Sequence, residues 1–402
     1  MAVPLLWHSR DTRLMNRFNV FAGLSLVGGL ALLGCSAASP PVTSAPAARE
    51  SLDAGCERLM KRAHVNGMAL ALIEGGQVAH VAAYGRRNVE RDLPLRTDTI
   101  MYGASLTKTA FAYMVLQLVE EGRLTLDTPF AELLPKPLPE YARYADLAGD
   151  ERWRALTPRI VLTHTTGFSN YRWIEEDKKL RFHSQPGTRY GYSGEGFFAL
   201  QLALEEGLHL DVGQEMQRRV FDRFGMSRTS MTWRPDFAEN LADGYTLEGT
   251  LRPHDERRRA AAAGSMDTTI ADQGKMWAGI LRGDGLSAAS RAEMTRPQVP
   301  ITSAHQFPTL RDWTDRRNAG IRLAAGLGLV TLRDKTGPAF FKGGHDDGTG
   351  NMVVCLETPQ RCVVLLSNDV RAERIFPEVV KLVLGKTRMP WYWEYGWLPE
   401  KQ

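Results

Sequence analysis

The chain has 402 residues, of which 43% are hydrophobic and 24% charged, and its formal net charge is +4. This composition fits an ordinary globular protein with one large domain or two closely packed lobes. The mild positive charge includes no long basic run interleaved with aromatic residues, so nucleic acid is not an expected partner.

Residues 1–34 have the pattern of a signal peptide. Arg17 precedes an apolar stretch over residues 20–33, which is too short to span a bilayer comfortably and has the length of a signal-peptide core. Met15 is then a more natural start than Met1. A plain secretory signal or a membrane anchor is the alternative interpretation.

The apolar stretch ends in Leu-Leu-Gly-Cys, which resembles the lipobox of bacterial lipoproteins. By that resemblance Cys35 carries a lipid, and Ser36 after it favours the outer membrane if the source is Gram-negative. The following residues are rich in Ser, Ala and Pro, so residues 35–50 are predicted to be a lipidated cysteine and a flexible linker. We therefore expect a lipid-anchored protein on the periplasmic side of a bacterial cell envelope.

Strand patterns occur at both ends of the remaining chain. Two apolar runs in residues 67–88 flank Gly75-Gly76, and two more in residues 350–369 flank a proline-containing turn, so each pair predicts a hairpin. A helix is expected near residues 372–385, and residues 104–285 are mainly helical in pattern. We predict a mixed α+β fold with two lobes, in which an antiparallel sheet built from both chain ends is flanked by helices and carries a mainly helical insertion.

Residues 51–388 form the predicted catalytic domain, and residues 389–402 form an unusually aromatic tail. Packing of this tail against its own domain is the favoured interpretation, and an interfacial membrane contact is the alternative.

Ser105 and Lys108 stand three residues apart at the start of an apolar helical pattern that ends before Gly122. Residues at this spacing share a helical face, so the amine can reach the hydroxyl and serve as its base. Taken alone, the pair is equally compatible with a serine at a helix start and a solvated lysine.

Two further motifs accompany this pair. Tyr192 follows a Pro-Gly turn and precedes a helical pattern, and Lys342 is followed by Gly343 and Gly344 beside a predicted strand. In order and approximate spacing, these motifs resemble the serine β-lactamase and penicillin-binding-protein family. The resemblance covers residues 55–385 and is strongest for the branch that contains class C β-lactamases, D-alanyl-D-alanine carboxypeptidases and esterases.

The resemblance implies a β-lactamase/transpeptidase-like fold and an acyl-enzyme on Ser105. Lys108 and Tyr192 would share the proton transfers, with the phenolate of Tyr192 favoured by the lysines on either side of it. Lys342 would attract a substrate carboxylate, and the backbone N–H groups of Ser105 and His345 would form the oxyanion hole.

Two positions depart from the family pattern. Gly194 stands where the branch has the Asn of Tyr-x-Asn, and Gly343 stands where it has the Thr or Ser of Lys-Thr-Gly. Both changes favour an esterase or a narrower peptidase over an efficient β-lactamase, whereas the retained Lys342 favours a substrate with a carboxylate. A carboxylesterase and a catalytically silent envelope-binding lipoprotein therefore remain alternatives to a D-Ala-type carboxypeptidase or β-lactamase-like hydrolase acting on a small molecule or a peptidoglycan peptide.

The cysteines and histidines suggest two further features. Cys355 and Cys362 flank the turn of the second hairpin, so a disulfide is expected in an oxidising compartment, with two free buried thiols as the alternative. His345 is followed by two aspartates, but adjacent residues in an extended segment point to opposite faces. We therefore expect neither a metal site nor a cofactor.

Overall fold

The computed structural model describes residues 46–396. The predicted signal peptide, Cys35, most of the predicted linker and the last six residues of the tail lie outside the described residues. Helix α1 spans Pro46–Ala63, so the end of the predicted linker, residues 46–50, belongs to a helix instead. No helix in the described part of the chain is both long enough and apolar enough to cross a membrane.

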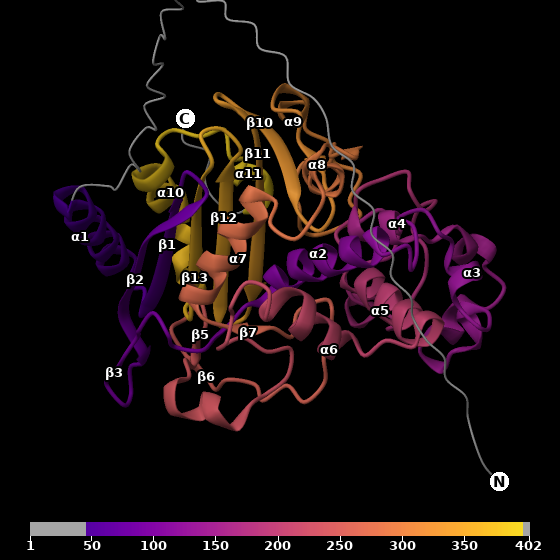
Figure 1. Cartoon of the computed structure of the whole chain (residues 1–402), viewed down its shortest axis with the longest axis horizontal. Helices are drawn as coiled ribbons and strands as arrows, with labels where there is room; N and C mark the ends of the chain where they lie inside the picture. The colour runs from indigo at the N-terminus through magenta and orange to yellow at the C-terminus, as the bar shows by residue number, and fades with distance from the viewer. Residues whose placement is uncertain (1–45, 397–402) are drawn as a thin grey trace, which may run out of the picture. The chain divides into compact units, whose positions relative to one another are not determined.

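A nine-stranded antiparallel sheet forms the centre of the fold, with the strand order β3-β2-β1-β13-β12-β11-β10-β9-β8 (Figure 1). Its strands are β1 (Gly67–Glu74), β2 (Gln77–Asn88), β3 (Leu93–Pro94), β8 (Val299–Pro300), β9 (Ala324–Ala325), β10 (Val330–Asp334), β11 (Gly337–Asp346), β12 (Thr349–Leu356) and β13 (Arg361–Ser367). Because β1 pairs with β13, the two ends of the chain build one sheet, and both predicted hairpins are confirmed.

Helices cover both faces of the sheet. Met68, Leu70 and Leu72 face one hydrophobic core together with residues of α1 and of α10 (Phe376–Leu384). Ala69 and Ala71 face the other core with α2 (Thr107–Glu120) and α7 (Ile270–Arg282). This alternation is the two-residue period of a strand that is buried on both faces. Figure 1 shows α1 and α10 on one side of the sheet and the helical insertion on the other.

The insertion contains the helices α2 (Thr107–Glu120), α3 (Phe130–Leu133), α4 (Pro158–Leu162), α5 (Gly194–Leu208), α6 (Val212–Met216), α7 (Ile270–Arg282) and α8 (Ala288–Thr295). It also contains two small two-stranded sheets, β4 (Met101–Tyr102) with β7 (Asp267–Thr268) and β5 (Gly244–Tyr245) with β6 (Leu251–Arg252). The remaining helices are α9 (Arg317–Gly320) and α11 (Trp391–Glu394). The predicted α+β architecture with a mainly helical insertion is therefore confirmed.

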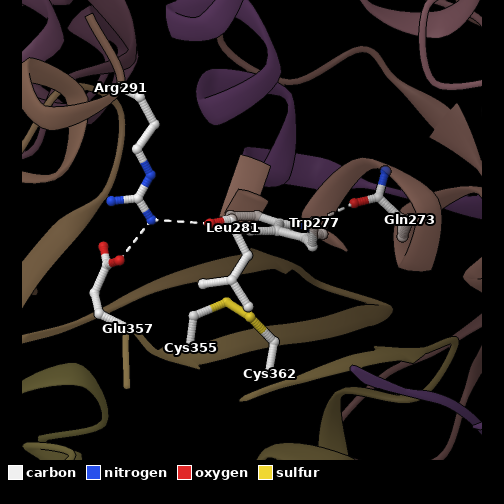
Figure 2. The surroundings of a disulfide bond; sticks show 7 residues. All are labelled: Gln273, Trp277, Leu281, Arg291, Cys355, Glu357 and Cys362. Carbon is white, nitrogen blue, oxygen red and sulfur yellow. Dashed lines mark hydrogen bonds and ion pairs between the residues drawn. A yellow bond between two sulfur atoms is a disulfide. The ribbon is translucent and has the colours of Figure 1, made fainter. Parts of the chain in front are cut away.

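Cys355 and Cys362 are direct cross-strand partners on β12 and β13, and their sulfur atoms are bonded. Both residues are fully buried in the core under α7, where Trp277 and Leu281 lie next to the disulfide (Figure 2). Cys56 is the only free cysteine among the described residues, and it is buried.

Candidate active site

Ser105 lies in a sharp turn between β4 and α2. Ala104 has a φ of 46°, in the left-handed region that residues with a Cβ rarely adopt, and a 3-10 turn over Ala104–Leu106 leads into α2. The Thr107 hydroxyl donates a hydrogen bond to the Ala104 carbonyl at 2.6 Å and accepts one from the backbone N–H of Met266 at 3.2 Å. These bonds hold the strained turn, so that Ser105 lines the pocket at the start of the helix.

Lys108 is completely buried one helical turn after Ser105. Its Nζ atom lies 3.0 Å from Ser105 Oγ and donates a hydrogen bond to the Ala263 carbonyl at 2.5 Å. Burial lowers the pKa of this amine well below its usual value, and the positive charge of Lys342 lowers it further. Lys108 is therefore not the solvated surface lysine of the alternative interpretation.

Tyr192 reaches Ser105 from the start of α5. Ser193 caps this helix because its hydroxyl accepts a hydrogen bond from the Gly196 N–H at 3.1 Å, which fixes the direction of the preceding residue. The Ser105 hydroxyl is close enough to lower the pKa of the Tyr192 phenol, and Lys108 Nζ lies 5.0 Å from the centre of the Tyr192 ring. The structure thus brings the three predicted residues, which come from two helix starts, together in one cluster.

The expected phenolate of Tyr192 is wrong. Burial raises the pKa of Tyr192 well above its usual value, and the Ser105 hydroxyl only partly opposes this effect. The two lysines do not reverse the direction, because the same burial makes their own charged forms less favourable. Tyr192 is consequently a neutral phenol that can donate a proton, and Lys108 is the better candidate for the base.

His164 supports the Tyr192 ring, a role that the sequence analysis did not predict. The two rings stack with their centres 4.2 Å apart, and the Ser193 backbone N–H donates a hydrogen bond to His164 Nδ1 at 3.1 Å. Burial, together with the charges of Lys108 and Lys342, lowers the pKa of His164 well below its usual value. The imidazole is therefore neutral and positions the phenol by contact rather than by charge.

Lys342 lies on β11 at the point where this strand loses one of its two neighbours. The pairing of β10 with β11 ends at Val330 and Phe341, whereas β12 continues alongside β11 as far as Asp346. Residues 342–346 therefore have a free strand edge, although β11 itself is an inner strand of the sheet.

The free edge of β11 lies against the turn that carries Ser105. A Cβ atom at Gly344 would lie only 3.1 Å from the Gly103 carbonyl oxygen, which is a tight contact, so the two backbones approach each other closely here. The next residue, His345, is held by a 2.8 Å hydrogen bond between its Nδ1 and Glu373 Oε1. The oxyanion hole expected from the backbone N–H groups of Ser105 and His345 stays a prediction.

Lys342 is buried and faces the same centre. Its Nζ atom donates hydrogen bonds to the Gly343 carbonyl at 2.5 Å and to the Tyr192 hydroxyl at 3.4 Å. Burial lowers the pKa of Lys342, and the negative charge of Glu394 opposes that shift. The Lys342 amine therefore contacts Tyr192, and Lys342 and Ser105 line the same cavity.

The predicted site residues other than Lys108 line a cavity of about 650 Å³: Ser105, Tyr192, Lys342, Gly343, Gly344 and His345. The cavity wall includes residues that the sequence analysis did not assign to the site: Asn170, Tyr171, His305, Gln306, Phe307, Pro308, Trp313, Glu373, Glu394 and Tyr395. The sequence feature that could have drawn attention to one of them is the position of Glu394, a single acid within the aromatic run of the tail. The described part of the tail, residues 389–396, packs against its own domain, in agreement with the favoured interpretation, and it also helps to form the pocket.

Side chains from elsewhere fill the space beside both departures from the family pattern. A Cβ atom at Gly194 would lie 2.4 Å from a ring carbon of Tyr171, and one at Gly343 would lie 2.0 Å from Glu394 Oε1. Neither glycine therefore leaves an empty space where the family has an asparagine or a threonine.

A serine hydroxyl beside a buried amine and a phenol, next to a free strand edge, is an arrangement that can support nucleophilic catalysis with lysine as a base. Among residues 46–396, no group of three His, Cys, Asp or Glu side chains is arranged to hold a metal ion.

Comparison with known proteins identifies the family. The sequence matches the beta-lactamase family over residues 52–383, and the chain therefore belongs to that family. It is 23% identical over 312 residues to the D-alanyl-D-alanine-carboxypeptidase/endopeptidase AmpH of Escherichia coli K12, covering 75% of this chain and 78% of AmpH. It is also 34% identical over 125 residues to the esterase EstB of Burkholderia gladioli, covering 31% of this chain and 30% of EstB.

A solved structure with the same fold is the D-alanine carboxypeptidase AmpC from Burkholderia cenocepacia. The TM-score is 0.66 at 18% identity, and the match covers 84% of this chain and 99% of that chain. The family thus contains carboxypeptidases and esterases as well as β-lactamases, and the fold alone does not choose among them.

Proposed function

We propose that the protein is an exported serine hydrolase that forms an acyl-enzyme on Ser105, with the carbonyl of an ester, a peptide or a β-lactam as the site of attack. The observation that carries this proposal is the 3.0 Å distance between Ser105 Oγ and the Nζ atom of the buried Lys108. An amine whose pKa is lowered in this way can be neutral near pH 7, and a neutral amine can accept the serine proton.

Acylation then follows from the geometry. Lys108 removes the proton of Ser105 as Oγ attacks the carbonyl carbon, and the negative charge on the carbonyl oxygen is held by the backbone N–H groups of Ser105 and His345. Each such donor typically stabilises the transition state by about 3 kcal/mol. Tyr192 gives its proton to the leaving group and regains one from Lys108. Water releases the acyl group by the reverse sequence of proton transfers.

We propose that esters are better substrates for this reaction than β-lactams. Tyr171 occupies the space beside Gly194, where the family has an asparagine side chain that binds a substrate amide. An ester has no amide N–H or amide oxygen that requires such a partner. The names of AmpH, a D-alanyl-D-alanine-carboxypeptidase/endopeptidase, and of the esterase EstB keep both peptides and esters among the proposed substrates.

The proposal is tested by trapping the acyl-enzyme. The protein is incubated with a p-nitrophenyl ester and, separately, with a fluorescent penicillin, and its intact mass and the labelled peptide are measured. We expect a burst of p-nitrophenol and an acyl group on Ser105, both absent in Ser105→Ala. A folded protein that neither releases p-nitrophenol nor acquires a label would instead indicate the catalytically silent envelope-binding protein.

We also propose that the protein is lipidated at Cys35 and anchored on the periplasmic side of the cell envelope. The apolar stretch before Leu-Leu-Gly-Cys supports this, and the disulfide between Cys355 and Cys362 is typical of an oxidising compartment. Metabolic labelling with an alkyne-bearing fatty acid should mark the protein and should fail for Cys35→Ser. Labelling of both, or recovery of the unmodified protein in the cytoplasm, would contradict the anchor.

A further inference from the structure

The C-terminal segment is fixed in the pocket by one aromatic residue. Trp393 is fully buried, with its ring centre 5.7 Å from that of Tyr190 and 6.1 Å from that of Phe341 on β11. Its carbonyl accepts a hydrogen bond from the Gln306 backbone N–H at 2.8 Å. Because this packing fixes α11 next to the strand, the residue after Trp393 is placed in the cavity that contains Ser105.

That next residue, Glu394, brings a carboxylate to the Lys342–Gly343 backbone. The Glu394 side chain is 8% exposed, and its Oε1 atom lies so close to Gly343 that a Cβ atom there would be 2.0 Å away. Its Oε2 atom accepts a hydrogen bond from Gln306 Nε2 at 2.8 Å. The carboxylate is thus held by its neighbours in a defined place beside the catalytic centre.

Glu394 and Lys342 influence each other's ionisation. Burial raises the pKa of Glu394 and lowers that of Lys342, and each charge favours the ionised form of the other group. The other charged groups that act on Glu394 are Glu373, which favours its neutral form, and His345, which favours its ionised form. The lysine that the family resemblance assigns to a substrate carboxylate is therefore already acted on by an acid of the protein itself.

A substrate carboxylate in this place would lie beside the buried carboxylate of Glu394, which bears a like charge when ionised. Like charges repel more strongly beside a buried group than in bulk water, and rejection of one substrate class is an efficient source of specificity. The packing does not require an acid here, because Trp393 supplies the buried apolar surface and Gln306 can donate to an amide oxygen equally well.

We propose that Glu394 determines specificity by excluding acyl donors that carry a carboxylate next to the scissile bond, and by selecting esters and amides that are uncharged there. This inference rests on the proposed function of Ser105. It reverses the expectation from the sequence, in which Lys342 attracts a substrate carboxylate.

The test uses two substrates that differ in one charge. An N-acylglycyl ester of 3-hydroxybenzoic acid is compared with the same ester of 3-hydroxybenzamide, and the ratio of their kcat/KM values is measured on the full chain. We expect the wild type to prefer the uncharged ester at least tenfold, which corresponds to about 1.4 kcal/mol. Glu394→Gln should reduce that preference at least tenfold.

Two further variants separate charge from shape. Glu394→Asp keeps the negative charge and should keep most of the preference. Glu57→Gln removes an equal charge from an exposed position on α1 and should leave the ratio at the wild-type value. If Glu394→Gln does not fold, the ratios of the wild type and of Glu394→Asp decide the question.

The outcomes distinguish this inference from the proposed function. Turnover of both esters with a wild-type preference for the carboxylate, a ratio unchanged in Glu394→Gln, or an equal loss of preference in Glu394→Asp would overturn the role of Glu394 and leave the serine hydrolase intact. Absence of turnover with both esters, together with absence of an acyl group on Ser105, would refute the proposed function and this inference with it.

Discussion

Replacing Tyr192 with phenylalanine removes one oxygen atom and leaves the packing around the ring in place. The stacked His164 ring and the Lys108 amine, 5.0 Å from the ring centre, contact the aromatic face, which phenylalanine retains. The lost contacts are the interaction with Ser105 that lowers the pKa of the phenol and the 3.4 Å hydrogen bond from Lys342. Because Lys342 keeps its hydrogen bond to the Gly343 carbonyl, the free energy of unfolding should change by no more than about 1.5 kcal/mol.

The effect of Tyr192→Phe on catalysis should be much larger than its effect on stability. Removal of a general acid typically costs at least about 100-fold in rate, or about 2.7 kcal/mol of transition-state stabilisation. We therefore expect kcat/KM for a p-nitrophenyl ester to fall by about 100-fold or more, while the urea unfolding curve stays close to that of the wild type.

A matched control removes a buried tyrosine hydroxyl elsewhere. Tyr113 is fully buried on α2, and its hydroxyl donates to the Asp284 carbonyl, away from the pocket. Tyr113→Phe should keep kcat/KM within about threefold of the wild type. A Tyr192→Phe enzyme with more than a fifth of the wild-type kcat/KM, alongside an inactive Ser105→Ala, would refute proton donation by this phenol.

Three further results are expected. Because protonated Lys108 cannot accept the serine proton, kcat/KM should fall as the pH drops through the lowered pKa of Lys108. Because the pKa of Tyr192 is raised, the phenol should stay protonated and kcat/KM should not fall near pH ~10. A profile with the opposite slope would contradict the role of Lys108 as the base and of Tyr192 as the acid. Replacing both Cys355 and Cys362 with alanine should lower the free energy of unfolding by about 2 to 3 kcal/mol in urea titrations. The reason is that the disulfide closes a short loop, with a sequence separation of 7, in the unfolded chain. An unchanged midpoint of the urea unfolding curve would contradict a formed disulfide. Glu195→Gln should destabilise the fold by about 3 kcal/mol, because the partly buried guanidinium of Arg172 then loses its fully buried carboxylate partner, 2.9 Å away. An unchanged melting curve would show that the ion pair between Arg172 and Glu195 contributes nothing to stability.

Local patterns in the sequence predict the parts of the site that depend on one segment each. The spacing of Ser105 and Lys108 on one helical turn places the amine at the hydroxyl, because a helix fixes that geometry locally. The glycines after Lys342 mark a strand that another backbone approaches closely, and Gly344 does approach the Gly103 carbonyl. Both hairpins follow from alternating apolar runs and their turn residues for the same reason.

Where a feature of the site depends on tertiary contacts, the sequence either did not predict it or predicted it wrongly. His164 and Glu394 enter the site from a loop and from the far end of the chain, and no local pattern relates either residue to Tyr192 or Lys342. The phenolate expectation failed because it counted the charges near Tyr192 and not their burial. Desolvation is a property of the folded surroundings, and here it determines the direction of the pKa shift for all three titratable groups of the centre.

The two departures from the family pattern are each accompanied by a side chain from another part of the fold. Tyr171 fills the space beside Gly194, and Glu394 fills the space beside Gly343, so a larger side chain at either glycine would collide with its neighbour. Restoring the family residue at one of these positions therefore requires a change in the side chain that now occupies the space. The two filled spaces support the proposed preference for esters over β-lactams, because the tyrosine and the glutamate that occupy them differ in chemistry from the asparagine and the threonine of the family pattern.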